Sequence, residues 1–419
     1  MSGHDVDALV TSAGQTAKAA ATGLSAAADE VVTHVLEEMA TRLTTAEAAV
    51  LAANDADVAA ARSGGMADAL IDRLRLSGDR LAAVAAQLRT LAAAPIPQRR
   101  TFVRELDGEL RLELWRRPVG VIGATFEARP NVVVDIASQL LRSGNTGVLR
   151  TGGAALRSCS ALVDEVIAPS LRRHGLPEGA IQLLRTADRA ASFALARHPE
   201  VIPLVIIRGS GETTRLLGRE AAAHGVRALA HADGGGVIYL DRAADPKTAV
   251  ETVRASLDRL GVCNRLNLLL VDRGAADSVW PDVHDLLDAL GITQAAPGQS
   301  DRPRGHEWAN DPGHEATVTV DWVDGADEAA AIANDETSAI AASILTEDAD
   351  TAGRFLRAFR GTGAFWNATT RWLDGYRLLG LPETGINVDH VPGPRGPVTF
   401  HDLHLRQYVV VPTHAATEV

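Results

Sequence analysis

Hydrophobic and polar positions recur with two different periods in the first quarter of the chain. Over residues 5–60 and 66–94, apolar residues and alanines recur every three or four positions with Asp and Arg between them, which predicts helices. Over residues 102–115 the period shortens, because three leucines at positions 110–114 alternate with charged residues as in a strand. The pair Asp107-Gly108 favours a hairpin turn within this segment.

This hairpin needs a partner, because an isolated pair of strands is only marginally stable in water. The β-rich stretch 405–411 near the end of the chain is one candidate. Another subunit is the alternative.

From residue 118 onward, short apolar runs alternate with helical patterns. The runs predict strands at 118–125, 146–150, 181–184, 203–207 and 226–230. The patterns between them predict helices at 131–142, 154–173, 189–197 and from 212 onward. This alternation is typical of a parallel sheet with helices on both faces.

The glycines within residues 231–236 end this series, and we place a domain boundary there. A second series follows, with strands predicted at 237–241, 266–271, 316–323, 340–345 and 363–367. Helices are predicted at 246–260, 275–290, 326–334 and 348–358, and residues 294–313 as irregular. The predicted fold class is therefore α/β, with two doubly wound domains.

Composition disfavours several classes of protein. A chain of 419 residues is too long for one ordinary core, and a hydrophobic content of 46% suits a folded protein. No apolar run approaches the roughly 20 residues that cross a bilayer, and the first residues lack the pattern of a signal peptide. The net charge of -12 disfavours general binding to nucleic acid but is compatible with a local basic pocket. Two cysteines cannot form a disulfide framework, which fits a reducing cytoplasm.

The two cysteines have different surroundings. Cys263 stands between a glycine and an apolar strand, so it is either a nucleophile or a small core residue. Cys159 lies inside the helix predicted at 154–173, where a packed side chain is the simpler interpretation.

A loop between a predicted strand and a predicted helix contains Arg208, Gly209, Ser210 and Gly211. The free N–H groups of such a helix start can bind a phosphate. The spacing does not match the dinucleotide fingerprint or the P-loop, so an ordinary tight turn is the alternative.

Other polar residues follow predicted strands or flank turns. Arg129 is a candidate for binding an anionic substrate, and Asn131 for donating to an oxyanion or capping a helix. Arg142 and Arg150 flank a turn and are candidates for holding the 2′-phosphate of NADP, with solvated arginines as the alternative.

A further polar cluster follows the strand predicted at 363–367. Asn367 and Arg371 either line a pocket or cap the next turn. The thirteen histidines show no spacing of paired metal ligands, and we predict no metal site.

Several of these segments, in one order, resemble γ-glutamyl phosphate reductase, also called glutamate-5-semialdehyde dehydrogenase, of the aldehyde dehydrogenase superfamily. They are Arg117-Pro-Val-Gly-Val-Ile-Gly123, Glu127-Ala-Arg-Pro-Asn-Val132, Arg142-Ser-Gly-Asn145, Val262-Cys-Asn264 and Asn367-Ala-Thr-Thr-Arg371 with Asp374-Gly375. The resemblance runs over nearly the whole chain, from residue 52 to residue 410.

The resemblance implies an aldehyde dehydrogenase-like fold with two doubly wound α/β domains and a β-flap for oligomerisation. Its parts would be a cofactor-binding domain (1–101 and 116–232, with part of 375–403), a catalytic domain (233–374) and the flap (102–115 with 404–413). The flap matches the hairpin that needs a partner.

The resemblance also implies a reaction, the NADPH-dependent reduction of an acyl phosphate to an aldehyde within proline biosynthesis. Cys263 would attack L-glutamyl 5-phosphate, phosphate would leave, and hydride would convert the thioester to the semialdehyde. The oxyanion donors would be Asn131 and the backbone N–H of Cys263.

Residue by residue, the implied site is as follows. Catalytic residues are Cys263 and Asn131; substrate-binding residues are Arg129, Asn264, Asn367 and Arg371; cofactor-binding residues are Arg142, Arg150, Arg208, Gly209, Ser210, Gly211 and Glu383. The expected protein is a cytoplasmic homodimer or homotetramer with NADP as cofactor and a glutamate kinase-type partner enzyme.

Some positions depart from the family pattern. Arg265 and Asn267 stand soon after Cys-Asn, where Thr or Glu-Thr is usual, Ile340 and Ala342 replace a His-Asp pair, and Pro312 interrupts a stretch that reaches the cofactor ribose in relatives. Two alternatives therefore stay open. One is a paralogue acting on a different acyl phosphate, thioester or aldehyde, and the other is a catalytically silent binding or scaffold member.

Overall fold

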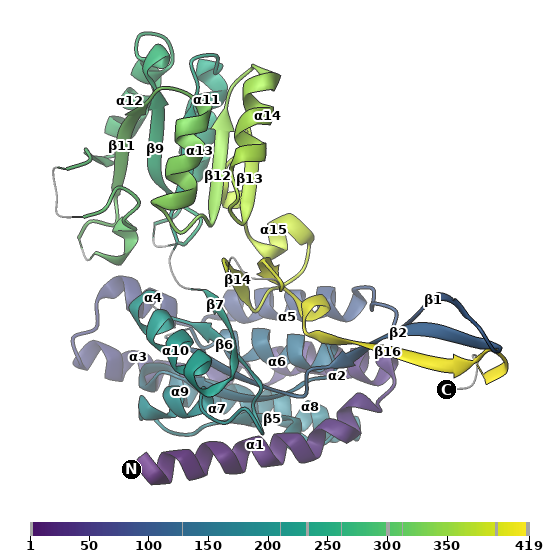
Figure 1. Cartoon of the computed structure of the whole chain (residues 1–419). Helices are drawn as coiled ribbons and strands as arrows, with labels where there is room; N and C mark the ends of the chain where they lie inside the picture. Colours follow the sequence, from purple (N-terminus) through teal and green to yellow (C-terminus); the bar gives the residue numbers. More distant parts are fainter. Residues whose placement is uncertain are drawn as a thin grey trace.

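The computed structural model describes residues 3–127, 129–209, 211–231, 234–260, 262–298, 302–311, 313–389 and 393–415. Within these ranges, no helix is both long and apolar enough to cross a membrane. The structure consists of two α/β units and a projecting three-stranded sheet (Figure 1).

The first unit is built on a parallel five-stranded sheet with the strand order β5-β4-β3-β6-β7. Its strands are β3 (Val121–Phe126), β4 (Thr146–Thr151), β5 (Ile181–Leu183), β6 (Leu204–Arg208) and β7 (Arg227–His231). All residues of β3 and β4 are buried, because helices cover both faces of the sheet and the strands are continuously apolar or small.

The helices of this unit come from two parts of the chain. The N-terminal set is α1 (Gly3–Ser25), α2 (Asp29–Thr45), α3 (Glu47–Ser63), α4 (Asp68–Leu74) and α5 (Gly78–Ala93). The set between strands is α6 (Val132–Arg142), α7 (Leu156–Leu162), α8 (Ala168–Arg173), α9 (Ala190–Leu195) and α10 (Gly211–His224). Helix α1 packs with α9 on one face of the sheet, whereas α2, α3, α5 and α6 share one apolar core on the other face.

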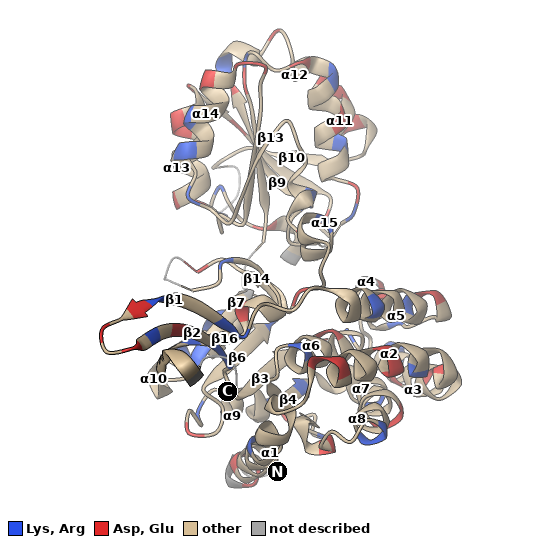
Figure 2. Ribbon diagram, turned by 90° about the vertical axis from the view of Figure 1, so that its right-hand side faces the viewer, with Lys and Arg blue, Asp and Glu red and all other residues tan. Residues whose placement is uncertain are grey.

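The second unit is built on a parallel six-stranded sheet with the order β10-β11-β9-β8-β12-β13. Its strands are β8 (Gly236–Leu240), β9 (Leu266–Asp272), β10 (Thr293–Ala295), β11 (Thr317–Val323), β12 (Ala341–Leu345) and β13 (Gly363–Trp366). Helices α11 (Pro246–Ser256) and α12 (Trp280–Ala289) cover one face, and α13 (Ala326–Asp335) and α14 (Ala349–Ala358) the other (Figure 2). The sequence pattern missed β10, which has only three residues and lies at the edge of the sheet.

The third part is an antiparallel sheet of β1 (Arg100–Leu106), β2 (Leu110–Pro118) and β16 (His404–Pro412), which we call the flap. The turn between β1 and β2 has positive φ at Gly108 (77°) and Glu109 (58°), as a tight hairpin requires. Strand β16 pairs with β2 along its whole length, which confirms that the C-terminal β-rich stretch completes the hairpin. Helix α15 (Gly375–Leu379) and the pair β14 (Gly385–Asn387) and β15 (Gly396–Val398) lead from the second unit to the flap.

The two sheets meet in a defined orientation. Strand β7 ends at His231 and β8 begins at Gly236, so the carboxyl edge of the first sheet faces the amino edge of the second (Figure 1). Residues that follow β3, β4 and β6 therefore lie opposite the residues that precede β8 and β9. This facing pair of edges positions the candidate site.

Candidate active site between the two sheets

Cys263 lies in the turn that precedes β9, at the amino edge of the second sheet. Two backbone hydrogen bonds of 2.6 Å hold this turn, because Gly235 N–H donates to the Cys263 carbonyl and Gly236 N–H donates to that of Arg265. A Cβ at Gly234 would lie 2.6 Å from the Cys263 Cα. The glycine run that looked like a domain boundary therefore also lets the chain approach the cysteine turn closely.

Side chains from the 3-10 turn Thr370–Trp372 brace the cysteine turn from the other side. Thr370 Oγ1 donates to the Asn264 carbonyl at 2.7 Å, and Asn264 Nδ2 donates to the Leu373 carbonyl at 2.9 Å. The Arg371 guanidinium donates to Asn264 Oδ1 and, at 2.8 Å, to Asp258. Asn264 and Arg371, predicted as substrate ligands, thus lie beside the cysteine, but these hydrogen bonds use their polar groups to hold the turn.

The carboxyl edge of the first sheet supplies positive charge near the cysteine. Arg129 follows β3 and Arg208 ends β6, and both charges lower the pKa of the Cys263 thiol. Burial lowers the pKa of Arg129 to about 10, and repulsion from Arg208, Arg73 and Arg259 adds to that shift. Several arginines therefore gather at the cysteine of an acidic chain, which is an arrangement suited to a multiply charged anion.

Negative charge reaches the cysteine from two carboxylates. Glu307 Oε2 accepts from Gly234 N–H at 2.7 Å, and Glu383 Oε2 accepts from Gly375 N–H at 2.7 Å. Burial and then the charges of Glu383 and Glu307 raise the pKa of Cys263 to about 12, against the opposing effect of the arginines. Glu383 was predicted at the cofactor site, whereas Glu307, in a Pro- and Gly-rich loop, carried no signal in the sequence.

The raised pKa leads to a prediction for the ligand-free protein. In a Cys159→Ala background, the rate of alkylation by iodoacetamide should rise about tenfold per pH unit between pH 7 and 10, because only the thiolate reacts. Arg129→Gln should slow alkylation further, since it removes a charge that lowers the thiol pKa. Mass-spectrometric rates across pH measure both effects, and a plateau below pH 8 would contradict the first.

Asn131 lies at the N-terminus of α6, but its side chain does not cap the helix. Its Nδ2 donates instead to Asp135 Oδ2 at 3.0 Å. Burial raises the pKa of Asp135 to about 6, although the charge of Arg208, the Asn131 hydrogen bond and the charge of Arg129 oppose the rise. Asp135 was not predicted from the sequence, where it stands out only as an acidic residue in the otherwise apolar first turn of α6.

Donors suited to a diphosphate lie along the carboxyl edge of the first sheet. Arg150 in β4 is buried, and its Nη2 donates to the carbonyls of Ala187 and Asp188 at 3.4 and 3.3 Å. Its Nε and the neighbouring Thr151 hydroxyl have no hydrogen-bond partner among the described residues, and a Cβ at Gly152 would meet open space. Gly209 lies close to Glu127, and Gly211 is the first residue of α10. Ser210, predicted with them, lies outside the described residues. These groups fit the phosphates of a dinucleotide at the strand ends.

Arg142 does not join this set. It ends α6, which returns the chain to the amino edge of the first sheet, whereas Arg150 lies at the carboxyl edge. Its guanidinium donates to the carbonyls of Ala92 (3.0 Å) and Ala94 (2.6 Å) at the end of α5. The expectation that Arg142 and Arg150 share one phosphate is therefore corrected. The two arginines are eight positions apart in sequence, but the length of β4 separates them in space.

Asn367 is also remote from the cysteine. Its N–H donates to the Ile344 carbonyl and its Oδ1 accepts from Thr346 N–H, both near the carboxyl end of β12. Cys263 lies at the amino edge of the same sheet. The expectation that Asn367 lines the substrate pocket is corrected, because the chain reverses after β13 and only Arg371 returns to the cysteine.

Among the departures from the family pattern that the structure describes, Ile340 packs with the cysteine, in an apolar cluster with Leu373 and Ile386. Pro312 lies outside the described residues. Ala342 lies in the core under α13 and α14, and Asn267 is bonded to His306 and Trp308 of a neighbouring loop. The cysteine therefore meets an apolar wall on this side. Among the described residues, no group of three or more His, Cys, Asp or Glu could hold a metal ion.

Arg265 is a buried charge for which no described residue provides a counterion. It is 2% exposed, one nitrogen donates to the Thr317 carbonyl at 3.2 Å, and its Nε and Nη2 have no hydrogen-bond partner within the described ranges. Burial lowers its pKa from 12.5 to about 10. At 1.36 kcal/mol per pH unit this shift opposes folding by about 3 kcal/mol. Because the folded-state pKa is the lower one, the penalty is complete below pH 10 and disappears as the pH rises above it.

Arg265→Met is therefore expected to raise the free energy of unfolding at pH 7 by about 1–3 kcal/mol, because it replaces an unpaired buried charge with an apolar side chain of similar length. Urea unfolding monitored by circular dichroism measures the change. Arg254→Met, at an exposed position of α11, is the matched control and should leave stability within about 0.5 kcal/mol of the wild type. A destabilised Arg265→Met protein would contradict the prediction.

The sequence of this chain is similar to a known protein family and to proteins with assigned names. The model of the aldehyde dehydrogenase family matches residues 2–301. A γ-glutamyl phosphate reductase from Rhizorhabdus wittichii is 36% identical over 97% of this chain and 95% of its own length. One from Synechococcus elongatus is 36% identical over 90% of this chain and 88% of its own length.

Solved structures agree in fold. The γ-glutamyl phosphate reductase of Thermotoga maritima superposes with a TM-score of 0.87 at 27% identity, covering 96% of this chain and 98% of its own. An acetylating aldehyde dehydrogenase from Geobacillus thermoglucosidasius has a TM-score of 0.72 at 14% identity, covering 98% of this chain and 97% of its own, which is a likeness of fold alone.

Proposed function

Because the chain belongs to the aldehyde dehydrogenase family and, within it, to the γ-glutamyl phosphate reductases, we propose that it reduces L-glutamyl 5-phosphate to the semialdehyde with NADPH, through a thioester on Cys263. One observation carries the proposal. Cys263 precedes β9 at the amino edge of the second sheet, and this edge faces the carboxyl edge of the first, where Arg129 follows β3 and Arg208 ends β6, so a nucleophile and two arginines lie at facing edges.

In the proposed reaction, Arg129 and Arg208 bind the phosphate group of the substrate as charged hydrogen-bond donors. The Cys263 sulfur attacks the acyl carbon, the bond from that carbon to the phosphate oxygen breaks, and the phosphate leaves with the electron pair. The thiol proton leaves with the phosphate, so no strong base is needed even though the free thiol has a raised pKa. Neutralising phosphate charge at the arginines makes this leaving group better.

Two groups of this chain are candidates for stabilising the oxyanion. One is the backbone N–H of Cys263. The other is Asn131, whose amide has a second N–H beyond the one that Asp135 accepts. The bond to Asp135 fixes the Asn131 side chain at the N-terminus of α6.

A reduced nicotinamide, when bound, supplies the hydride that a thioester needs to become an aldehyde. Arg150, Gly209 and Gly211 would hold its phosphates at the carboxyl edge of the first sheet. Arg142 lies at the opposite edge of this sheet and would not reach the 2′-phosphate of NADP.

The proposal is tested by the reverse reaction with purified protein. Glutamate 5-semialdehyde and NADP should give NADPH only when inorganic phosphate is present, because phosphate must cleave the thioester. Absence of phosphate-dependent NADPH formation would reject the glutamyl assignment. Parallel assays with aspartate semialdehyde and with an N-acylated semialdehyde test the alternative that the protein is a paralogue with a different substrate. The apolar wall around Ile340 favours this alternative.

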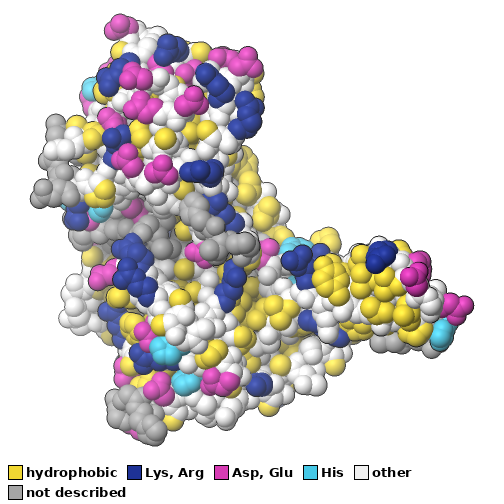
Figure 3. Space-filling view, in the orientation of Figure 1, with side chains coloured by type: hydrophobic (Ala, Val, Ile, Leu, Met, Phe, Trp, Pro, Cys, Tyr) yellow, Lys and Arg dark blue, Asp and Glu magenta, His cyan; other side chains and the backbone are white. Residues whose placement is uncertain are grey.

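We further propose that the flap mediates self-association. Strands β1 and β16 expose large apolar side chains, which Figure 3 shows on the projecting arm. The exposed side chains include Phe102 (52%), Leu405 (54%), Tyr408 (66%) and Val410 (51%). Apolar side chains gathered on a projecting sheet are typical of a protein interface.

Tyr408→Glu combined with Val410→Glu is therefore expected to convert the protein to a monomer, because charged side chains would replace apolar ones in the interface. Light scattering after size-exclusion chromatography measures the mass. Leu290→Glu, at an exposed position next to α12, is the control and should leave the mass unchanged. An unchanged mass in the double variant would contradict a flap-mediated assembly.

A further inference from the structure

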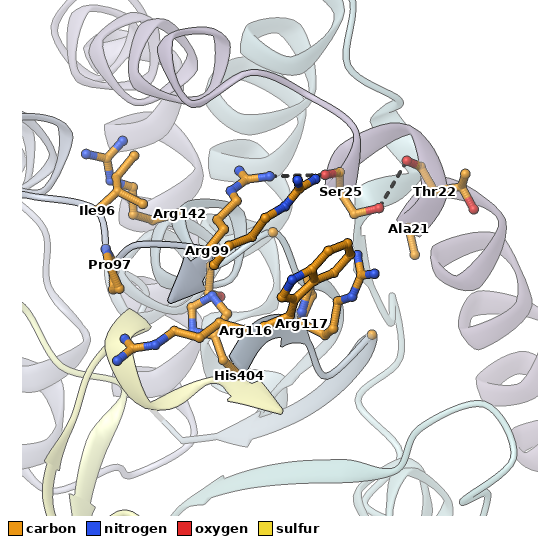
Figure 4. Close-up of a pocket in the computed structure, with 16 residues that line it drawn as sticks. Ala21, Thr22, Ser25, Ile96, Pro97, Arg99, Arg116, Arg117, Arg142 and His404 are labelled. Carbon is orange, nitrogen blue, oxygen red and sulfur yellow. Dashed lines mark hydrogen bonds between the residues drawn. The ribbon is translucent and has the colours of Figure 1, made fainter. Parts of the chain in front are cut away.

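A second cavity lies far from the cysteine, where the flap joins the first unit. Its volume is about 510 Å³, and Figure 4 shows its lining side chains. It is formed by the end of α1, the linker before β1, the end of β2, the end of α6 and the start of β16. Because α6 begins at the cleft and ends here, the cavity is at the opposite edge of the first sheet from the candidate active site.

The lining of this cavity is strongly basic. It contains five arginines and one histidine, namely Arg99, Arg100, Arg116, Arg117, Arg142 and His404. No carboxylate is among the lining residues. This concentration of one sign of charge is unexpected in a chain with a net charge of -12.

Two of the arginines have structural roles at helix ends. Arg142 donates to carbonyls at the end of α5, and Arg99 donates to the Ser25 carbonyl at the end of α1 and forms an ion pair with Asp29. Cations stabilise the negative ends of helix dipoles, so these contacts are accounted for by the fold. The Nε of Arg142 nevertheless has no partner, although the residue is 7% exposed and lines the cavity.

The other three arginines are not explained in this way. Arg100 and Arg117 both stack on the Trp115 ring, with their Cζ atoms 4.4 and 4.5 Å from its centroid, and Arg117 also donates to Gln407. Neither these two nor Arg116 forms an ion pair with a carboxylate in the part of the chain that the structure describes. All three line the cavity together with Arg142.

The charges of these arginines also affect the pKa values of two neighbouring histidines, His401 and His404. Burial and then the charges of Arg116, His401 and Arg99 lower the pKa of His404, against a hydrogen bond with the His401 backbone. The pKa of His401 is lowered by burial and by Arg116 and Arg142, although Asp402 opposes the shift. Burial is the largest cause of both shifts, and the arginine charges add to it in the same direction.

We propose that this cavity is a second anion site, which binds a small molecule bearing phosphate groups independently of the catalytic cleft. A volume of about 510 Å³ is in the range of small-ligand pockets and exceeds the need of a single phosphate ion. Planar guanidinium groups match the oxygens of phosphate in pairs, and the three arginines without a carboxylate partner provide several such donors. The stacked Arg100–Trp115–Arg117 arrangement holds two of them in place before a ligand arrives.

The test uses pyrophosphate as the probe and the full chain as the protein. Arg100→Gln combined with Arg116→Gln removes two exposed lining charges without touching the cleft. The matched control is Arg89→Gln combined with Arg104→Gln, which changes the net charge equally at exposed positions outside the cavity. Isothermal titration calorimetry measures binding, and hydrogen exchange of peptides covering 96–100 and 115–120 locates it.

Wild type and control should show a binding event that the cavity variant loses or weakens about tenfold or more, as expected for removal of charged donors. Pyrophosphate should slow hydrogen exchange in the peptides covering 96–100 and 115–120 only in the proteins that show this binding event. Equal binding by all three proteins, or an equal loss in the control, would overturn the proposal. Citrate binding as tightly as pyrophosphate would overturn the assignment to phosphate.

Discussion

Replacing Cys263 by alanine is expected to lower kcat for reduction of the acyl phosphate by about 10⁴-fold or more, the scale seen when a covalent nucleophile is removed. Without the sulfur no thioester can form, and water or phosphate cannot reproduce a nucleophile held opposite Arg129 and Arg208. Steady-state rates with the acyl phosphate, or with the semialdehyde and phosphate in reverse, measure the effect.

Cys159→Ala is the matched control for this loss. Cys159 is fully buried in α7, and its thiol donates weakly to the Pro130 carbonyl at 3.8 Å. Its kcat should stay within about twofold of the wild type, because Cys159 is enclosed in the core of the first unit and does not lie in the turn before β9 that carries Cys263. A Cys263→Ala protein with more than about a tenth of wild-type activity would exclude the thioester route.

The second large effect is expected from a residue that carries no functional group. Gly234→Ala should lower kcat/KM by about 100-fold, the loss that a misplacement of 1 Å can cause. A methyl group at Gly234 would lie 2.6 Å from the Cys263 Cα, from the Cys263 carbonyl oxygen and from Glu307 Oε1. Two of these atoms are backbone, so the cysteine turn itself must move.

This variant keeps the Cys263 thiol but displaces it, so it tests the position of the thiol and not its presence. Gly234→Ala should still be alkylated at Cys263, whereas the rate of turnover falls. Gly218→Ala, where the added methyl group meets open space within α10, is the control and should leave activity unchanged while stabilising the helix by up to about 1 kcal/mol. Wild-type kinetics in Gly234→Ala would show that the turn tolerates displacement and would contradict the close packing described for it.

Much of the architecture could be predicted from local patterns. Continuous apolar runs became buried parallel strands, and alternation at residues 110–114 became a strand with one partner on each side. These patterns are reliable because burial on one or two faces of a sheet imposes a period on the sequence itself. The short edge strand β10 was not predicted, because its three exposed or half-exposed residues show almost no periodicity of apolar positions.

Assignments of individual side chains were less successful, and the failures share a cause. Arg142 lies near Arg150 in sequence and Asn367 near Arg371, yet in each case a strand or a reversal of the chain sends one residue to the opposite edge of a sheet. Asn264 and Arg371 were predicted as separate ligands, but they bond to each other. Sequence distance says little about where a side chain points once the chain turns.

The sequence by itself determined the class of fold and the cysteine at the start of a buried strand, and it offered the terminal strand as one candidate partner of the hairpin, which the structure then showed. Hydrophobic period and motif order encode these features locally or in series. Only the tertiary structure brought Arg129 and Arg208 to Cys263, placed Glu307 beside Gly234, and gathered arginines from three segments around one cavity. Such features depend on the packing of two sheets and a flap, whose contacts join residues that no local pattern connects.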